Sequence, residues 1–278
     1  MARTLLAMLA ATGLALSAGA LAQRADRGTE IAYGSDPQQQ LDYWPGRSEH
    51  APLVVFVHGG GWSRGDKRMM QGSDKLSHWQ AKGYAVASLN YRLVPDATVE
   101  QEAADVASAV ALLKQRYAPR RIALVGHSAG AHLVALIGTD PSYLTAAGLS
   151  YTDIAGVVPL DGAAYDVPAQ LSDGPRIMQR MYRQAFGTDA ARQARLSPTT
   201  QAAAPNASEF LILHVQREDG VRQSQKLGAE LRRAGTDVEV EGFPGTGLQG
   251  HAEINRRMGD PDYPATPVLD AFLTKVFG

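Results

Sequence analysis

The sequence predicts an α/β fold, in which one mainly parallel β-sheet is covered by helices on both faces. Short apolar runs alternate with segments of helical periodicity along most of the chain, which is typical of parallel sheets in α/β proteins. Of the 278 residues, 45% are hydrophobic and 20% are charged, as in globular proteins. This length favours one large α/β domain over two ordinary ones.

Apolar runs bounded by turn residues predict the strands of this sheet. Six clear runs cover residues 53–57, 84–89, 121–125, 154–160, 210–215 and 238–243. Two weaker runs near the N-terminus, 31–33 and 41–43, predict short edge strands. Several of the clear runs end at residues that suit a sharp turn, such as Gly126 and Asp161. The carboxyl ends of these strands are therefore where we expect the functional loops.

Helices are predicted from capping residues and from apolar stripes. Thr98 and Gln101 form a capping box before a stripe of apolar residues that ends at Tyr117. A second helix is expected to end near Gly235, a residue typical of the position after a helix. Thr266 followed by proline predicts the start of the last helix. A further helix is expected after Ser128, and His78 lies in a helical segment before the second strand.

The pattern loosens between residues 162 and 209. This stretch contains four prolines and has a helical middle near residues 176–186. A long insertion after the carboxyl end of a strand lies over the edge of the sheet where ligands bind. We therefore expect a small cap over the active site, with an ordinary surface crossover as the alternative.

The N-terminus has the features of a secretory signal peptide. Arg3 provides a positive start, an apolar run follows from residue 5 to residue 21, and Ala20–Leu21–Ala22 has the small-x-small pattern of a cleavage site. We expect residues 1–22 to be removed, leaving an exported, periplasmic or secreted domain over residues 23–278 without stable membrane insertion. The alternative is an uncleaved membrane anchor, because the run approaches spanning length.

Composition excludes several classes of function. The formal net charge is −1 and the basic residues are scattered, which argues against nucleic-acid binding. The chain contains no cysteine, so disulfides, thiol nucleophiles and thiolate metal sites are excluded. No Walker loop or dinucleotide fingerprint follows a strand, and His251–Ala252–Glu253 lacks the further ligands of a metal site. No metal and no organic cofactor is expected.

The strongest functional motif is Gly126–His127–Ser128–Ala129–Gly130, which matches G-x-S-x-G. It lies between a buried strand and a helix, where this motif exposes a serine hydroxyl on a strained corner. The start of the following helix adds partial positive charge where an oxyanion forms. Ser128 is therefore predicted to be a nucleophile, and a tight structural turn is the alternative.

A glycine-rich loop, His58–Gly59–Gly60–Gly61–Trp62, follows the first clear strand. Backbone N–H groups of Gly60, Gly61 and Ala129 are the predicted oxyanion-hole donors, since glycine leaves the backbone open to the substrate. His58 is expected to brace the loop. Trp62 and His127 are predicted to border the substrate pocket, although Trp62 could equally be a half-buried aromatic residue.

A serine nucleophile needs a base, and the base needs a carboxylate to orient it. Of the seven histidines, His251 follows the last strand and the predicted loop 244–250, where a hydrolase base belongs. Asp219 follows the fifth strand and is the predicted acid, while Glu218 and Asp161 remain alternatives. The order serine, aspartate, histidine along the chain is that of the α/β-hydrolases.

These motifs resemble the α/β-hydrolase superfamily, and within it the hormone-sensitive-lipase-like and arylformamidase-like esterases. The resemblance extends over most of residues 50–278 and is carried by the runs 58–62, 90–93, 126–133, 197–198 and 251–255. It implies the same roles for Ser128, His251, Asp219 and the three oxyanion donors. Two departures are the histidine at position 127, where lipase-like members often have aspartate, and an altered spacing near residues 217–221, which bears on the acid.

The expected function is hydrolysis of short-chain acyl esters, which are small-molecule substrates, through an acyl-enzyme. An arylformamidase-type amide hydrolase that cleaves N-formylkynurenine is the alternative, although an exported N-terminus argues against that cytosolic role. A catalytically inactive binding protein is disfavoured by the complete set of motifs. A lipase acting at lipid interfaces is disfavoured because residues 162–209 are polar and rich in arginine.

Overall fold

The computed structural model describes residues 27–278, so the predicted signal peptide, 1–22, lies outside the described residues. Strands were found at every predicted position. They are β1 Thr29–Ala32, β2 Gln40–Trp44, β3 Leu53–Val57, β4 Ala85–Leu89, β5 Ile122–His127, β6 Gly156–Leu160, β7 Glu209–Gln216 and β8 Asp237–Thr246.

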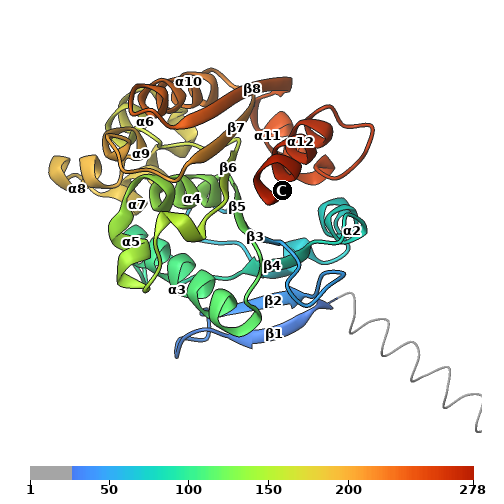
Figure 1. Ribbon diagram of the computed structural model, residues 1–278. Helices are drawn as coiled ribbons and strands as arrows, with labels where there is room; N and C mark the ends of the chain where they lie inside the picture. Colours follow the sequence, from blue (N-terminus) through green and yellow to red (C-terminus); the bar gives the residue numbers. More distant parts are fainter. Residues whose placement is uncertain (1–26) are drawn as a thin grey trace, which may run out of the picture.

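These eight strands form one sheet with the order β1-β2-β4-β3-β5-β6-β7-β8 (Figure 1). The pairs β1–β2 and β2–β4 are antiparallel, and all other neighbouring pairs are parallel. The prediction of a mainly parallel sheet is confirmed. Because β3, β5, β6 and β7 run in the same direction, the loops after them gather along one edge of the sheet.

Helices cover both faces of the sheet. Those outside residues 162–209 are η1 Lys67–Met70, α2 Asp74–Ala81, α3 Val99–Tyr117, α4 Ala129–Thr139, α5 Pro141–Ala146, η2 Tyr151–Asp153, α10 Glu218–Arg233, α11 Gly247–Arg257 and α12 Ala265–Phe277. Helices α3, α4 and α10 lie on one face, and α2, α11 and α12 lie on the other (Figure 1).

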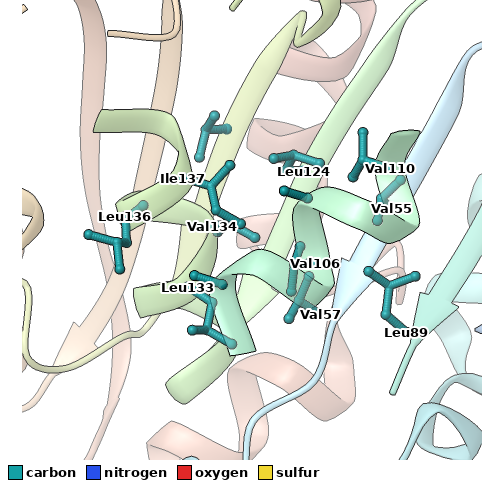
Figure 2. Close-up of a cluster of buried hydrophobic side chains, with 14 of the residues drawn as sticks. Val55, Val57, Leu89, Val106, Val110, Leu124, Leu133, Val134, Leu136 and Ile137 are labelled. Carbon is teal, nitrogen blue, oxygen red and sulfur yellow. The ribbon is translucent and has the colours of Figure 1, made fainter. Parts of the chain in front are cut away.

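The two faces of β3 show why the sheet is covered on both sides. Leu53, Val55 and Val57 pack with α3 and α4, as Figure 2 shows for the two valines. Val54 and Phe56 point to the opposite face, into a second cluster with α2 and α12. Successive side chains of a strand point to opposite faces, and burying each of these side chains contributes about 1.5–3 kcal/mol.

The segment 162–209 is mostly helical. It contains α6 Val167–Asp173, η3 Arg176–Met178, α7 Gln179–Phe186, α8 Ala190–Arg195 and α9 Pro198–Gln201, so the predicted helical middle near residues 176–186 is confirmed. None of the helices within residues 27–278 is long and apolar enough to cross a membrane.

Two element boundaries differ from the predictions. The predicted loop 244–250 is instead the end of β8 and the first turn of α11, because β8 continues to pair with β7 past a bulge as far as Thr246. The last helix begins at Ala265 rather than after a Thr266 cap. The Thr266 hydroxyl accepts a hydrogen bond from the Gly259 N–H, which takes it away from the capping role.

Candidate active site

Ser128 lies at a strained corner between β5 and α4. Its backbone has φ 58° and ψ −117°, a conformation that L-residues rarely adopt. A Cβ atom at Gly126 would lie 2.2 Å from the Gly130 carbonyl oxygen, and one at Gly130 would lie 2.1 Å from the Val57 carbonyl oxygen. Both glycines are therefore required for this corner, which leaves the Ser128 side chain half-buried at the edge of the sheet.

His251 is within hydrogen-bonding distance of Ser128. Its Nε2 atom lies 3.0 Å from Ser128 Oγ, and its Nδ1 atom lies 2.6 Å from an oxygen of Asp161. A carboxylate oxygen only accepts, so Nδ1 carries the proton and Nε2 is free to accept one from the hydroxyl. The imidazole is on the second turn of α11 rather than on a loop, which gives it a rigid support.

The carboxylate that contacts His251 is Asp161, so the prediction of Asp219 as its partner was wrong. Asp219 lies in the first turn of α10, where it accepts hydrogen bonds from Arg217 and from Gln170. The other alternative, Glu218, has a side chain that is 92% exposed and pairs with Arg222. The guanidinium of Arg217 binds Asp219 through Nη1 and Asp161 through Nε. Of these two aspartates, Asp161 at the end of β6 is the one that contacts the imidazole.

Asp161 is held as a buried carboxylate at the end of β6. Its side chain is fully buried, and it accepts hydrogen bonds from the Val215 N–H, from Arg217 and from His251. Burial raises the pKa of this carboxyl, but the His251 hydrogen bond and the Arg217 charge outweigh burial, and the pKa falls to about 2. Asp161 is therefore ionised throughout the neutral pH range.

His127 supports the helix that carries His251. Burial and the nearby His251 lower the pKa of His127 to about 3, so the ring is neutral at neutral pH. Its Nε2–H donates to the carbonyl oxygen of His251 at 3.0 Å, and the two rings lie 4.6 Å apart. His127 also borders the pocket, where the sequence placed it.

The glycine loop after β3 packs directly against the serine. A Cβ atom at Gly59 would lie 2.8 Å from Ser128 Cβ. Gly60 and Gly61 have φ values of 135° and 62°, conformations that favour glycine. Ala129 is the first residue of α4, where a backbone N–H has no acceptor within the helix. Gly60 and Gly61 line the same pocket as Ser128, and Ala129 follows the serine in the chain, so the three predicted oxyanion donors lie near it.

The buried rings of His58 and Tyr91 pack against the glycine loop. The His58 Nδ1–H donates to the Gly59 carbonyl oxygen at 2.8 Å, and the ring stacks on Tyr91 at 4.5 Å. The Tyr91 hydroxyl donates in turn to the His58 carbonyl oxygen. These contacts agree with the expected bracing role of His58.

Trp62 is buried, with 1% of its surface exposed, and its indole N–H donates to His132 Nδ1 at 3.3 Å. Because burial lowers the pKa of His132 to about 4, this ring is neutral and can accept that bond. The other ring nitrogen of His132 donates to the Leu196 carbonyl oxygen. Trp62 is therefore fixed by hydrogen bonding as well as by packing, and it borders the pocket.

A pocket of about 400 Å³ opens above Ser128 and His251. Met178, Met181 and Tyr182, all from the segment 162–209, form part of its wall. A Cβ atom at Gly61 would lie 2.0 Å from the sulfur of Met181, so this methionine contacts the glycine loop. Within residues 27–278 there is no group of three or more histidine, aspartate or glutamate side chains that could hold a metal ion.

A serine, a histidine and an aspartate joined by hydrogen bonds at the carboxyl edge of a mainly parallel sheet, beside a glycine loop, define the α/β-hydrolase class. The chain belongs to the BD-FAE family, whose model matches residues 41–231. The order along the chain, Ser128, Asp161, His251, is that of the class, although the acid follows β6 instead of β7.

Curated relatives and solved structures agree with this class. The esterase LipC of Mycobacterium tuberculosis is 29% identical over 252 residues, which are 80% of this chain and 62% of LipC. A kynurenine formamidase of Debaryomyces hansenii is 29% identical over 108 residues, 37% of each chain. The chain thus spans less than two thirds of the length of these relatives.

Among solved structures, esterase 2 of Thermogutta terrifontis superposes with a TM-score of 0.74 at 19% identity and covers 91% of this chain and 96% of its own. Esterase B of Lactobacillus rhamnosis has a TM-score of 0.71 at 22% identity, and the match covers 100% of this chain and 96% of that chain. At these identities the superpositions establish the fold.

Proposed function

We propose that this protein is a serine hydrolase that cleaves carboxylic esters with short acyl chains through an acyl-enzyme intermediate. The observation that carries the proposal is the hydrogen-bonded series Ser128–His251–Asp161, with distances of 3.0 and 2.6 Å. The names of relatives such as the esterase LipC support an ester substrate. Since the acid is Asp161, the roles assigned to Ser128 and His251 stand without Asp219.

In the first half of the reaction, Ser128 Oγ attacks the ester carbonyl while His251 Nε2 takes the hydroxyl proton. Asp161 stays ionised and stabilises the imidazolium that forms, because its pKa of about 2 keeps it from taking the proton itself. Collapse of the tetrahedral intermediate transfers that proton to the leaving alcohol and leaves the acyl group on Ser128.

In the second half, a water molecule takes the place of the alcohol. His251 removes its proton as it attacks the acyl-enzyme, and the proton then returns to Ser128 Oγ as the carboxylic acid leaves. In both halves the negative charge on the carbonyl oxygen faces the N–H groups of Gly60, Gly61 and Ala129. One such donor typically supplies about 3–4 kcal/mol of transition-state stabilisation.

Labelling by a fluorophosphonate probe and turnover of p-nitrophenyl acetate test the proposal. The protein should react with one probe molecule per chain, and Ser128→Ala should abolish both labelling and turnover. His251→Ala should fall to a residual rate on the order of 10³–10⁴-fold above water, as when a triad member is lost. Equal labelling of Ser128→Ala and the unchanged protein would remove the basis of the proposal.

A pocket of about 400 Å³ that also has to hold the alcohol favours small acyl groups. Acetate and butyrate esters of p-nitrophenol should therefore give a higher kcat/KM than the laurate and palmitate esters. A maximum at the long chains would contradict the preference for short acyl groups while leaving the hydrolase assignment intact.

A formamidase is the second candidate, because kynurenine formamidases of two yeasts match 37% and 52% of this chain. The same triad and oxyanion donors serve a formamide as well as an ester. Turnover of N-formylkynurenine with a kcat/KM above that of p-nitrophenyl acetate would favour this candidate.

We also propose that the protein is exported through a cleaved signal peptide, on the basis of the N-terminal pattern alone. N-terminal sequencing of protein purified from an expressing bacterium should begin at Gln23. Material in the membrane fraction that starts at Met1 or Ala2 would indicate an anchor instead.

A further inference from the structure

Arg217 lies between two buried carboxylates. The guanidinium Nε donates to Asp161 Oδ2 at 2.9 Å, and Nη1 donates to both oxygens of Asp219 at 3.1 and 3.2 Å. The three side chains are 9%, 0% and 10% exposed. Such a cluster is costly to bury unless its charges and hydrogen bonds are matched, and here one cation is shared by two anions.

Arg217 acts on the same oxygen that His251 uses. Asp161 Oδ2 receives both the Arg217 Nε–H and the His251 Nδ1–H. Arg217 Nη2 also donates to the Gly162 carbonyl oxygen at 3.0 Å, next to the Asp161 backbone, which has φ 44°. The guanidinium therefore fixes both the carboxylate and the strained turn that presents it.

Asp219 connects this cluster to the segment that walls the pocket. Its Oδ2 accepts a hydrogen bond from Gln170 Nε2 at 3.0 Å, and the same amide lies 3.0 Å from the Tyr182 hydroxyl. Both Arg217 and Tyr182 border the pocket. A buried polar chain thus runs from His251 to helices α6 and α7.

We propose that Arg217 is a positioning residue that holds Asp161 against His251, and that Asp219 offsets its positive charge, so that the pair sets the pH range in which His251 works as a base. The proposal rests on the ester-hydrolase function proposed above. It gives Asp219 an electrostatic role in place of the acid role expected from the sequence.

Removing the charge of Arg217 and removing the charge of Asp219 should have opposite effects on the protonation of His251. A positive charge near His251 disfavours its protonated form and a negative charge favours it. Without Arg217, both carboxylates act on the imidazole unopposed, and protonation is favoured. Without the charge of Asp219, Arg217 is less compensated and protonation is disfavoured. Arg217 Nε and His251 Nδ1 lie 2.9 and 2.6 Å from the same oxygen, Asp161 Oδ2, and charges as close as this typically shift such equilibria by about one pH unit or more.

Other titratable groups around His251 stay constant in this comparison. His127 faces it from β5, and Lys75 of α2 donates to the Asn255 carbonyl oxygen on the same helix. Tyr182 borders the same pocket, and Glu253 shares α11 with His251.

The neighbouring strands β7 and β8 also carry titratable side chains. His214 of β7 is buried and bonds to the Val215 carbonyl oxygen, while Glu239 and Glu241 of β8 are exposed to solvent. None of these groups is altered by a change at position 217 or 219.

The experiment measures kcat/KM for p-nitrophenyl acetate from pH 5 to pH 9 in Arg217→Met, Arg217→Lys, Asp219→Asn and the double variant Arg217→Met/Asp219→Asn. The acid limb is the low-pH side of this profile, where protonation of His251 lowers kcat/KM. Its midpoint should move to higher pH by about one unit in Arg217→Met and to lower pH in Asp219→Asn. The midpoint of the double variant should lie between those of Arg217→Met and the unchanged protein. Arg217→Lys keeps the positive charge, so its acid limb should lie close to that of the unchanged protein. Its kcat should be lower, because an ammonium cannot reproduce the hydrogen bonds of the guanidinium to both aspartates.

Two readouts separate electrostatics from mere loss of structure. Arg222→Met, a change to an exposed arginine that pairs with Glu218, should leave the limb in place. The ring protons of His251 should titrate by NMR with the same order of midpoints as the kinetic limbs, in protein that need not turn over. If Arg217→Met does not fold, the downward shift in Asp219→Asn and the Arg217→Lys profile decide the question.

A lower rate at every pH, with the limb unmoved in Arg217→Met and in Asp219→Asn, would overturn the proposal and leave the pair a structural one. If the proposed ester-hydrolase function itself is wrong, the result is distinguishable from this one. The unchanged protein would then neither hydrolyse the ester nor react with the fluorophosphonate, whatever its His251 titration showed.

Discussion

At the scale of single residues, the site depends on which carboxylate an imidazole can reach. Asp161 and Asp219 are both buried and both bind Arg217, yet only Asp161 contacts His251. One carboxylate orients the base, and the other is separated from it by the guanidinium.

Asp161→Asn should therefore lower kcat by on the order of 10⁴-fold, because an amide in this place favours the wrong tautomer of the imidazole. Asp219→Asn should retain most of the activity at pH 8. Steady-state kinetics on p-nitrophenyl acetate, with circular dichroism to verify folding, make the comparison. A larger loss in Asp219→Asn than in Asp161→Asn would return the acid role to Asp219.

Sequence reasoning predicted that Ser128 and His251 come together, as they do, because a local motif marks the candidate nucleophile and chain order marks the candidate base. It misassigned the acid, since two aspartates follow neighbouring strands, Asp161 after β6 and Asp219 after β7. Both bind Arg217, and Asp161 is the one that lies within reach of the His251 imidazole on α11. Arg217, two residues before Asp219, was visible in the sequence, but no local rule shows that it binds both carboxylates or that His251 contacts Asp161.

Glu102 of α3 is a buried carboxyl outside the triad. Its side chain is fully buried, and burial raises its pKa from 4.5 to about 9. Between these two values the unfolded chain is ionised and the folded protein is not, so the unfolded state binds fewer protons and stability falls as pH rises. The slope is about 1.4 kcal/mol per pH unit for one such group.

Glu102→Gln should remove this contribution. The free energy of unfolding in urea should fall less between pH 5 and pH 8 in the variant than in the unchanged protein, and the variant should be the more stable one at pH 8. Parallel decreases in both proteins over that range would show that Glu102 does not titrate in this way.

At the scale of elements, alternation and capping predicted most of the fold. Every predicted strand was found, and the Thr98–Gln101 capping box is present at the start of α3. The errors lie at the end of β8 and the start of α12. There, pairing with β7 past a bulge and a hydrogen bond from Gly259 to Thr266 override local signals. The first is a contact between distant segments, and the second joins two residues seven positions apart, so neither follows from the periodicity of a single element.

Gly130→Ala tests the close approach of α4 to β3. The added Cβ would lie 2.1 Å from the Val57 carbonyl oxygen, so backbone has to move, and overpacking of this kind costs about 3 kcal/mol. Gly148→Ala is the matched control, because a Cβ there meets nothing within 4 Å and only its positive φ is strained, at about 1 kcal/mol. Urea unfolding should show this difference, and only Gly130→Ala should lose esterase activity; equal effects would contradict the packing argument.

At the scale of the whole molecule, separate elements meet to form an apolar mouth around the pocket. The large hydrophobic side chains exposed within residues 27–278 are Met69, Ile177 and Leu248, at 52%, 82% and 59%. They come from η1, η3 and α11, and Met69 and Leu248 border the pocket directly. Ile177 lies in the same short segment as Pro175 and Met178, which border the pocket. No single segment of the sequence predicts this ring, because it exists only in the assembled fold.

Such a mouth should bind the alcohol part of an ester whose acyl group lies deeper in the same pocket. Losing about 50 Å² of apolar contact costs about 1.2 kcal/mol at about 25 cal/mol per Å², roughly an eightfold change in binding. Met69→Ser and Leu248→Ser should each raise KM for 1-naphthyl acetate by about this factor. KM for methyl acetate should stay unchanged, since its alcohol is too small to reach the mouth. Equal changes for both esters would mean that the substitutions disturb the triad rather than the mouth, and no change for either would mean that the alcohol leaves by another side of the pocket.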